Sequence, residues 1–330
     1  MSKFSDVADT SHQLSLAAME EASRTGHRTA DIEHLLLALT LTDQPGGQVL
    51  RSFGVTIEMT RHAIAQQHEE QLASLGVTAH PSADGPIVFH ETGGYEWSDR
   101  ALAIIQRAAG RGRRGDAIAV LRELVAEPSG LIGDLLRRMD TLPEELLERL
   151  DDADRIPSPP TADRPRRPLS RRSEAFVPAS LDEVWALLSD PRRIPEWDQS
   201  IGRVDAELSE PPQTGDAWVA HAQTHHADGR PLQIARELRR RFVQLDALEP
   251  ETRVAWRTTF PDRERANARV VDLALAPAAH GTQVTISMAW DRHPARRPLP
   301  LVGWCMRPLT RLALWLQASQ IGGGISRVFR

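Results

Sequence analysis

Five prolines lie within residues 157–168 of this 330-residue chain, close to its midpoint. Each proline fixes φ and lacks a backbone N–H, so this segment cannot form a regular helix and favours an extended conformation. The same stretch passes from three aspartates within 151–154 to five arginines within 164–172. We therefore predict a linker over residues 151–172, between a domain over residues 1–150 and a domain over residues 173–330. Two domains also suit a chain of this length.

Residues 4–150 have the pattern of helices joined by short turns. Apolar residues at 32, 35, 36 and 39 form one stripe at helical spacing. Ser5 and Ser98 are each followed by aspartate, which is typical of the cap and first turn of a helix. The sequence F-S-D-V-A at 4–8 returns as W-S-D-R-A at 97–101, and V-L-R-S-F-G at 49–54 is echoed by L-L-R-R-M-D at 135–140. This internal repeat predicts an all-α, pseudo-symmetric bundle of two helical units.

Residues 173–330 change to the pattern of an antiparallel sheet followed by a helix. Apolar and polar residues alternate over 254–258, 271–275 and 284–290, as in half-buried strands. A short helix is predicted over 181–188 after a cap at Ser180, and a long helix over 308–321. The glycines at 322–324 are expected to form a frayed tail. Seven of the eight tryptophans lie in this half, so its core must differ from that of the helical half, and the chain as a whole is of class α+β.

Composition and charge exclude several classes of protein. The net charge of −5 argues against a general nucleic-acid binder, and Cys305, the only cysteine, leaves no partner for an internal disulfide. We therefore expect a cytoplasmic protein. The most apolar late stretch, 299–316, is interrupted by arginines, and the first residues have no apolar signal core, so no membrane span is expected. Lys3 is the only lysine and belongs to no G-x-x-x-x-G-K-[ST] loop, so no ATPase motor is expected.

The helical half resembles the tandem N-terminal (Clp R, or Clp-N) domain of Clp ATPase subunits over residues 4–150. The residues that carry the resemblance are F-S-D-V-A at 4–8, E-E-A at 20–22, Gly26-His27 and E-H-L-L-L-A-L at 33–39. The resemblance implies a docking module for adaptors and substrates and, as in some members, for arginine-phosphorylated proteins and cyclic peptide antibiotics. It implies that Glu33 pairs with a guanidinium. The second repeat has I-A-V-L-R-E-L at 118–124 instead, so only Glu33 carries over. Phe4 and Trp97 are predicted to line a groove for an apolar peptide.

The second half resembles the SRPBCC superfamily, the helix-grip fold of polyketide cyclase-like and START-type lipid-binding proteins, over residues 173–321. The matching residues are V-P-A-S at 177–180, E-V-W at 183–185, L-S-D-P at 188–191, P-E-W-D at 195–198 and, after Pro277, G-T-Q-V-T at 281–285. The resemblance implies a curved antiparallel sheet around a long C-terminal helix, with an apolar cavity between them. Some members bind lipids or polyketides, some are cyclases, and some regulate chaperones.

Six large side chains are candidates for the lining of that cavity. They are Trp218, Trp256, Met288 and Trp290 from the sheet, and Trp304 and Trp315 from the helix. Cavities for small molecules are mostly apolar, with few polar groups. The alternative for each of these residues is plain core packing. Trp185 and Trp197 belong to the structural pattern and are assigned to the core.

Two polar patterns have both a functional and a structural interpretation. His221, His225 and His226 could hold zinc, but no cysteine or His–Glu pair accompanies them, so a polar strand or loop is preferred. The arginines at 236 and 239–241, like the basic stretch at 292–297, could bind an anion or an acidic partner, and otherwise form a solvated strand face. We predict no metal, no cofactor and no catalytic residue.

These observations favour a non-enzymatic binding protein of the Clp protease system. It would act as an adaptor, a decoy or a sequestering module for Clp components, clients or Clp-directed cyclic peptide antibiotics, and its second domain would bind a hydrophobic small molecule. The alternative is a polyketide cyclase-like or hydrolase-like enzyme with an appended partner-binding domain. A transcription-linked sensor is a third possibility, but no basic DNA-binding helix pair accompanies it.

Overall fold

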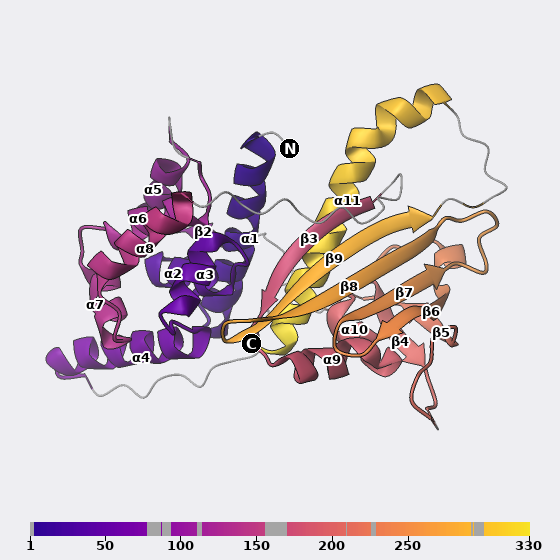
Figure 1. Cartoon of the computed structure of the whole chain (residues 1–330), viewed down its shortest axis with the longest axis horizontal. Helices are drawn as coiled ribbons and strands as arrows, with labels where there is room; N and C mark the ends of the chain where they lie inside the picture. Colours follow the sequence, from indigo (N-terminus) through magenta and orange to yellow (C-terminus); the bar gives the residue numbers. More distant parts are fainter. Residues whose placement is uncertain are drawn as a thin grey trace. The chain divides into compact units, whose positions relative to one another are not determined.

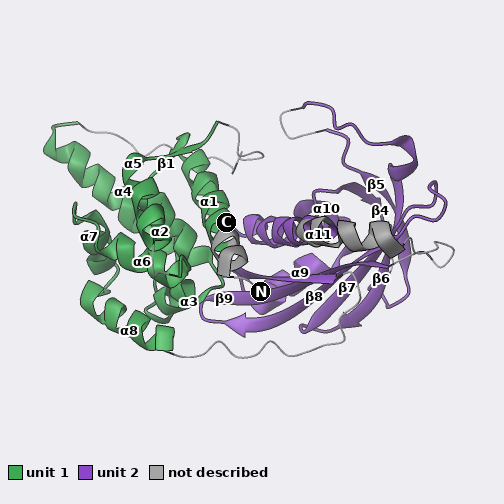
Figure 2. Cartoon of the chain, turned by 90° about the horizontal axis from the view of Figure 1, so that it is seen from above, with its two compact units in different colours: residues 1–159 green, residues 160–330 purple. Residues whose placement is uncertain are grey.

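The computed structural model describes residues 3–77, 87, 94–110, 114–155, 170–208, 210–225, 229–291, 293 and 300–330, without the side chains of residues 3–9, 300–309, 311 and 312. The chain forms two compact units, Met1–Pro159 and Pro160–Arg330, drawn in green and purple in Figure 2. Both ends of the predicted linker at 151–172 have regular secondary structure. Residues 151–155 are helical, and residues 170–172 begin a strand. Residues 156–169, with all five prolines, lie outside the described part.

The first unit is helical and repeats one order of elements. Its first half contains α1 (Lys3–Arg24), β1 (Thr29–Ala30), α2 (Ile32–Leu41), α3 (Pro45–Ser52) and α4 (Ile57–Ser74). Its second half contains β2 (Glu96–Trp97), α5 (Asp99–Ala108), α6 (Ala117–Val125), α7 (Leu131–Arg138) and α8 (Pro143–Arg155). Both halves thus supply four helices in series, and the short parallel pair of β1 with β2 joins them. The all-α bundle predicted from the internal repeat is confirmed.

Helix caps and one apolar stripe explain where these helices form. Ser98 caps α5 by accepting a hydrogen bond from the amide of Ala101, as predicted. Ser5 lies inside α1, which begins at Lys3, so its predicted role as a cap is wrong. Asp31 caps α2, whose apolar stripe at 32, 35, 36 and 39 is completely buried in the core of the unit. The α3 helix ends just before Gly54, whose φ of +79° few other residues adopt.

The second unit is an antiparallel sheet that curves across a long C-terminal helix (Figure 1). Its strands are β3 (Ser170–Val177), β4 (Ile201–Asp205), β5 (Ala217–Ala222), β6 (Arg240–Glu249), β7 (Arg253–Thr259), β8 (Ala268–Ala278) and β9 (Gly281–Asp291), in the order β3-β9-β8-β7-β6-β5-β4. Its helices are α9 (Leu181–Ser189), η1 (Pro191–Arg193), α10 (Ile194–Trp197), η2 (Arg236–Leu238) and α11 (Pro300–Val328). The predicted helix-grip architecture is therefore confirmed, with α11 packed against β3, β9 and α10.

The helix α11 differs from its prediction at both ends. It spans Pro300–Val328 rather than 308–321, and the glycines expected in a frayed tail lie inside it. A Cβ added at Gly322 would lie 2.9 Å from the Cβ of Ala175, and one at Gly324 only 2.3 Å from the carbonyl oxygen of Trp197. The glycines thus let the helix approach β3 and α10 closely, which is why the helix continues through them. Of the helices that the structure describes, none has the length and apolar content needed to cross a membrane.

Candidate functional site

Glu33, the predicted partner-binding glutamate, lies in the first turn of α2. Its side chain is only 12% exposed, and its Oε2 atom lies 3.7 Å from Nη2 of Arg100 in α5. That oxygen is buried and accepts no hydrogen bond within the described part of the chain. Glu33 therefore faces one guanidinium at a distance too long for a hydrogen bond, and one of its acceptor atoms is unused.

Asp31, the cap of α2, holds the same guanidinium in place. It accepts hydrogen bonds from Nε and Nη2 of Arg100 and, at 2.5 Å, from the hydroxyl of Ser98. Burial raises the pKa of Asp31, but the hydrogen bonds from Arg100 and Ser98 outweigh burial and leave the pKa below its ordinary value. Two of these side chains belong to the first repeat and two to the second, so we call Asp31, Glu33, Ser98 and Arg100 the repeat-junction cluster.

Trp97 lies next to this cluster in the structure. It pairs with Ala30, the residue before Asp31, and its half-buried ring packs against the core of the first unit. Phe4 belongs to α1, but its side chain is outside the described residues. The structure therefore brings Trp97 and Glu33 to one junction, while a groove lined by Phe4 and Trp97 stays a prediction.

The second repeat places an apolar residue where the first has Glu33. Asp116 caps α6 as Asp31 caps α2, so the second residue after each cap occupies an equivalent position. That residue is Glu33 in the first repeat and Ile118, only 5% exposed, in the second. The two caps thus support the sequence-based alignment in which only one repeat carries the glutamate.

Four of the residues predicted to line a cavity in the second unit belong to its core or pack against it: Trp218, Trp256, Met288 and Trp290. Trp256 and Met288 are buried, and the indole N–H of Trp256 donates a hydrogen bond to the carbonyl of Leu188 at 3.0 Å. Trp315 is half-buried on α11, and the side chain of Trp304 lies outside the described residues. A common cavity lined by all six stays a prediction.

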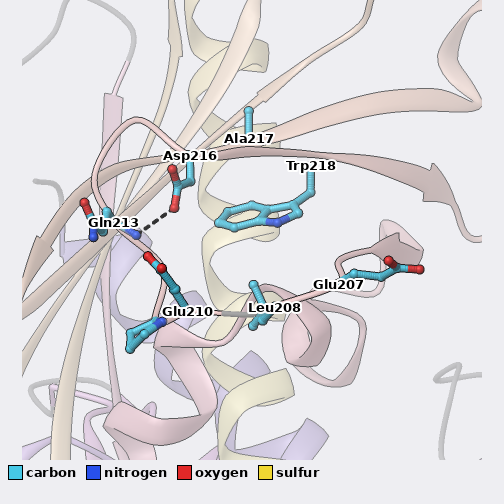
Figure 3. A pocket seen from close by; sticks show the side chains of 8 residues that line it. Glu207, Leu208, Glu210, Gln213, Asp216, Ala217 and Trp218 are labelled. Atoms are coloured by element: carbon cyan, nitrogen blue, oxygen red, sulfur yellow. Dashed lines mark hydrogen bonds between the residues drawn. The ribbon is translucent and has the colours of Figure 1, made fainter.

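Trp218 and Trp290 are half-buried, and each lies near one of two cavities. Trp218 lines a cavity of about 370 Å³ with seven other residues, three of which carry carboxylates: Glu207, Glu210 and Asp216 (Figure 3). Its ring centroid lies 6.1 Å from that of Trp256. The ring of Trp290 stacks on Phe260 at 6.4 Å, and Phe260 lines a second cavity of about 790 Å³ at the loop between β7 and β8.

Sequence reasoning considered Arg241 as one of the arginines that could bind an anion, but it missed the buried polar group to which Arg241 belongs. Arg269 in β8 forms an ion pair with Asp198, and both side chains are less than 10% exposed. The hydroxyl of Ser200 donates to Asp198 at 2.7 Å and accepts from Nη1 of Arg241 in β6 at 3.0 Å. We call Asp198, Ser200, Arg241 and Arg269 the buried arginine cluster. Asp198 ends the P-E-W-D motif, and Arg241 alternates with Val243 and Leu245, which was the available signal.

Burial and like charge both act on this cluster. Burial and, to a smaller extent, the charge of Arg269 lower the pKa of Arg241 to about 10, while the charge of Asp198 acts in the opposite direction. Burial raises the pKa of Asp198, but the charge and hydrogen bond of Arg269 outweigh it, so the net pKa lies below its ordinary value. Asp198 therefore stays ionised between two guanidinium groups.

Two of the three histidines considered for zinc are described by the structure, and each has a polar neighbour. The Nε2 atom of His221 lies 2.9 Å from a carboxylate oxygen of Asp205 on the neighbouring strand, and both side chains are about 40% exposed. The ring of His225 lies 3.0 Å from the hydroxyl of Thr224, and His226 lies outside the described residues. In the described ranges, no group of three metal-ligating side chains was found.

Comparison with known proteins found family matches within each unit. Residues 8–86 match the family described as the Clp repeat (R) N-terminal domain, and residues 170–314 match the family described as polyketide cyclase / dehydrase and lipid transport. The search of curated proteins found no match.

Several solved structures are similar to about half of this chain. CV1439 from Chromobacterium violaceum is 15% identical over 49% of this chain and 98% of its own, with a TM-score of 0.34. The Polyketide_cyc-like protein Cgl2372 from Corynebacterium glutamicum is 18% identical over 48% and 90%, with a TM-score of 0.33. TTHA0849 from Thermus thermophilus is 15% identical over 48% and 96%, with a TM-score of 0.34.

Proposed function

We propose that this chain, which joins a Clp repeat (R) N-terminal domain to a domain of the polyketide cyclase / dehydrase and lipid transport family, is a binding protein of the Clp protease system. Its first unit docks an arginine-bearing peptide or protein partner, and its second unit holds a hydrophobic small molecule. It acts in the cytoplasm as an adaptor, a decoy or a sequestering module for Clp components, clients or cyclic peptide antibiotics. The observation that carries this proposal is the unused acceptor oxygen of Glu33.

A buried carboxylate oxygen without a hydrogen bond is unfavourable, because the desolvation of a charged group is not compensated. The guanidinium of Arg100 forms the ion pair with Glu33, but its hydrogen bonds go to Asp31 and its side chain is 42% exposed. An arginine of a partner can take the place of Arg100 at Glu33 and form the two parallel hydrogen bonds that a carboxylate accepts best. Arg100 then acts as an internal competitor for the docking site.

The test measures binding of fluorescent peptides to the full chain by anisotropy. One peptide carries a central phosphoarginine, a second carries arginine and a third carries lysine. We expect the arginine peptides to bind and Glu33→Gln to weaken their binding about tenfold, because one charged hydrogen-bonded pair is lost. The matched control is Glu123→Gln, since the Glu123 side chain is also 12% exposed and pairs with Arg107.

The role of Arg100 is tested in the same assay. We expect Arg100→Ala to strengthen binding of the arginine peptides several-fold, while Arg107→Ala, which removes an exposed arginine of the same helix, leaves it unchanged. Equal binding of arginine and lysine peptides, or equal effects of the two glutamate variants, would contradict docking at Glu33.

The ligand of the second unit is tested separately by native mass spectrometry of the purified full chain. We expect the measured mass to exceed that of the polypeptide. Extraction with organic solvent should remove this extra mass. The same measurement on a sample extracted with solvent and refolded is the control. A mass equal to that of the bare chain in every preparation would argue against a retained hydrophobic ligand.

A further inference from the structure

The buried arginine cluster contains more positive than negative charge. Arg241 and Arg269 each carry one positive charge, Asp198 carries one negative charge, and all three residues are at most 9% exposed. An excess charge in the interior is costly unless a counter-ion or several hydrogen bonds compensate it. The described side chains of the cluster therefore leave one positive charge without a neutralising negative charge.

The described residues of the unit supply no second carboxylate to Arg241. Among them, Asp198 is the only carboxylate whose charge acts on Arg241. The other element that crosses the inner face is α11, and residues 292–330, which include it, contain no aspartate or glutamate at all.

Both arginines have hydrogen-bond donors to spare. The Nε atom of Arg269 is buried and has no partner among the described residues. Arg241 uses Nε for the carbonyl of Leu238 and Nη1 for Ser200, and in the described part no acceptor is bound to its Nη2. Guanidinium groups with unused N–H donors are well suited to a carboxylate, whose two oxygens each accept hydrogen bonds.

Aromatic rings lie beside the cluster. The guanidinium of Arg241 lies 5.5 Å from the ring centroid of Phe260, and Phe260 stacks on Trp290. Trp290 is the partner of Arg269 in the register of β8 and β9. Phe260 also lines the cavity of about 790 Å³, whose lining includes neither Arg241 nor Arg269.

We propose that Arg241 and Arg269 bind the carboxylate of an aromatic or otherwise apolar organic acid, whose hydrocarbon part lies against Phe260 and Trp290. This assignment rests on the proposed function of the second unit as a carrier of a hydrophobic ligand and names the chemical class of that ligand. Asp198 and Ser200 are positioning residues, since they hold the two guanidinium groups side by side and do not contact the ligand.

The experiment compares 2-naphthoate with 2-naphthamide, which has nearly the same shape but no charge. Dissociation constants for the full chain are measured from quenching of tryptophan fluorescence. We expect 2-naphthoate to bind at least tenfold more tightly than 2-naphthamide. In Arg241→Gln this preference falls to near unity while 2-naphthamide still binds. The control is Arg240→Gln, because Arg240 precedes Arg241 on β6, pairs with the exposed Asp262 and leaves the preference unchanged.

The outcomes separate this inference from the function on which it rests. Equal binding of the two probes to the intact chain, or equal loss in both arginine variants, would overturn the carboxylate site and leave the hydrophobic carrier standing. Binding of neither probe would overturn both. Circular dichroism verifies folding of Arg241→Gln. If that variant does not fold, the preference of the intact chain and its partial retention in Arg241→Lys decide the question.

Discussion

The carboxylate of Glu21 is a buried charge that pairs with an arginine from another helix. Its side chain is 2% exposed, and it accepts three hydrogen bonds of 2.8–3.0 Å from Arg61 in α4. Removing the arginine takes one positive charge and these three hydrogen bonds away from a buried carboxylate. We therefore expect Arg61→Ala to lower the free energy of unfolding of the first unit by about 3 kcal/mol, measured by urea denaturation with helical circular dichroism as the signal.

The matched control is Arg137→Ala. Arg137 pairs with Asp134 in α7, and both side chains are more than half exposed. Exposed ion pairs contribute less than about 1 kcal/mol, so the control should stay within that limit. If both variants lost the same free energy of unfolding, the burial of Glu21 would not explain the effect of removing Arg61.

The ion pair of Asp198 with Arg269 predicts how the free energy of unfolding depends on pH. The folded-state pKa of Asp198 lies below its ordinary value of 3.8, so the pair stabilises the folded chain fully above that value and the stabilisation is lost as pH falls through the folded pKa. Asp198→Asn lacks this stabilisation at every pH. We expect the difference in unfolding free energy between the two proteins to be largest near pH 7 and to shrink below pH 3.8.

Tryptophan fluorescence is the appropriate signal, because seven of the eight tryptophans lie in the second half of the chain. Some pH dependence should remain in the variant, since the exposed carboxylates of Glu183 and Asp205 also have lowered pKa values through their hydrogen bonds to Ser180 and His221. A difference that does not change as the solution is acidified from neutral pH to below the pKa of Asp198 would mean that Asp198 is not held ionised by Arg269.

Local signals were sufficient for residues whose role is set by their neighbours in sequence. The cap at Ser98 and the buried stripe at 32, 35, 36 and 39 follow from short-range geometry, and both are confirmed. Asp198 and Arg269 are 71 residues apart, and only the tertiary fold brings them together. Arg241 follows two other arginines, so residue type alone does not show which of the three is buried. That depends on which face of β6 turns toward the core.

At the scale of elements, the glycines of α11 are the clearest departure from prediction. Glycine is enriched just beyond helix ends, which is why the run at 322–324 indicated a stop. In the folded unit the absent side chains leave room for Ala175 and for the backbone of Trp197, and tertiary packing outweighs the low helix propensity of glycine. A periodic pattern gives the existence of such a helix but cannot show what the helix packs against.

The close approach at Gly324 predicts the effect of adding one methyl group. In Gly324→Ala the new Cβ would lie 2.3 Å from the carbonyl oxygen of Trp197, and a backbone oxygen cannot turn aside as a flexible side chain can. Overpacking outweighs the gain in helix propensity, so we expect a loss of about 1–3 kcal/mol in the free energy of unfolding of the second unit, followed by tryptophan fluorescence.

The control for this variant is Gly133→Ala. Gly133 lies inside α7, and a Cβ there would meet only the flexible guanidinium of Arg137, at 3.4 Å. With room available, alanine should stabilise the first unit by up to about 1 kcal/mol through its better helix propensity. Destabilisation by both substitutions would mean that contact with α10 is not the cause.

For the whole molecule, the two units differ in how they build their cores. The first is filled by aliphatic and small side chains of its helices, while the second places Trp197, Trp256 and Met288 between its sheet and helices. The proline-dense stretch and the uneven tryptophan distribution were enough to predict two architectures. The exact ends of α8 and β3 were not predictable, because the residues at 151–155 and 170–172 are polar and have no periodic apolar pattern.

Separate cores predict separate unfolding. We expect fragments 1–159 and 160–330 each to fold alone, the first with the circular dichroism of a helical protein and the second with that of a mixed one. In the full chain, Arg61→Ala should lower only the midpoint of the first unit's unfolding, which is followed by helical circular dichroism. Gly324→Ala should lower only the midpoint of the second unit's unfolding, which is followed by tryptophan fluorescence. The double variant should show both losses unchanged, since distant substitutions add. An unfolded fragment, or a fluorescence transition shifted by Arg61→Ala, would show that the two cores depend on each other.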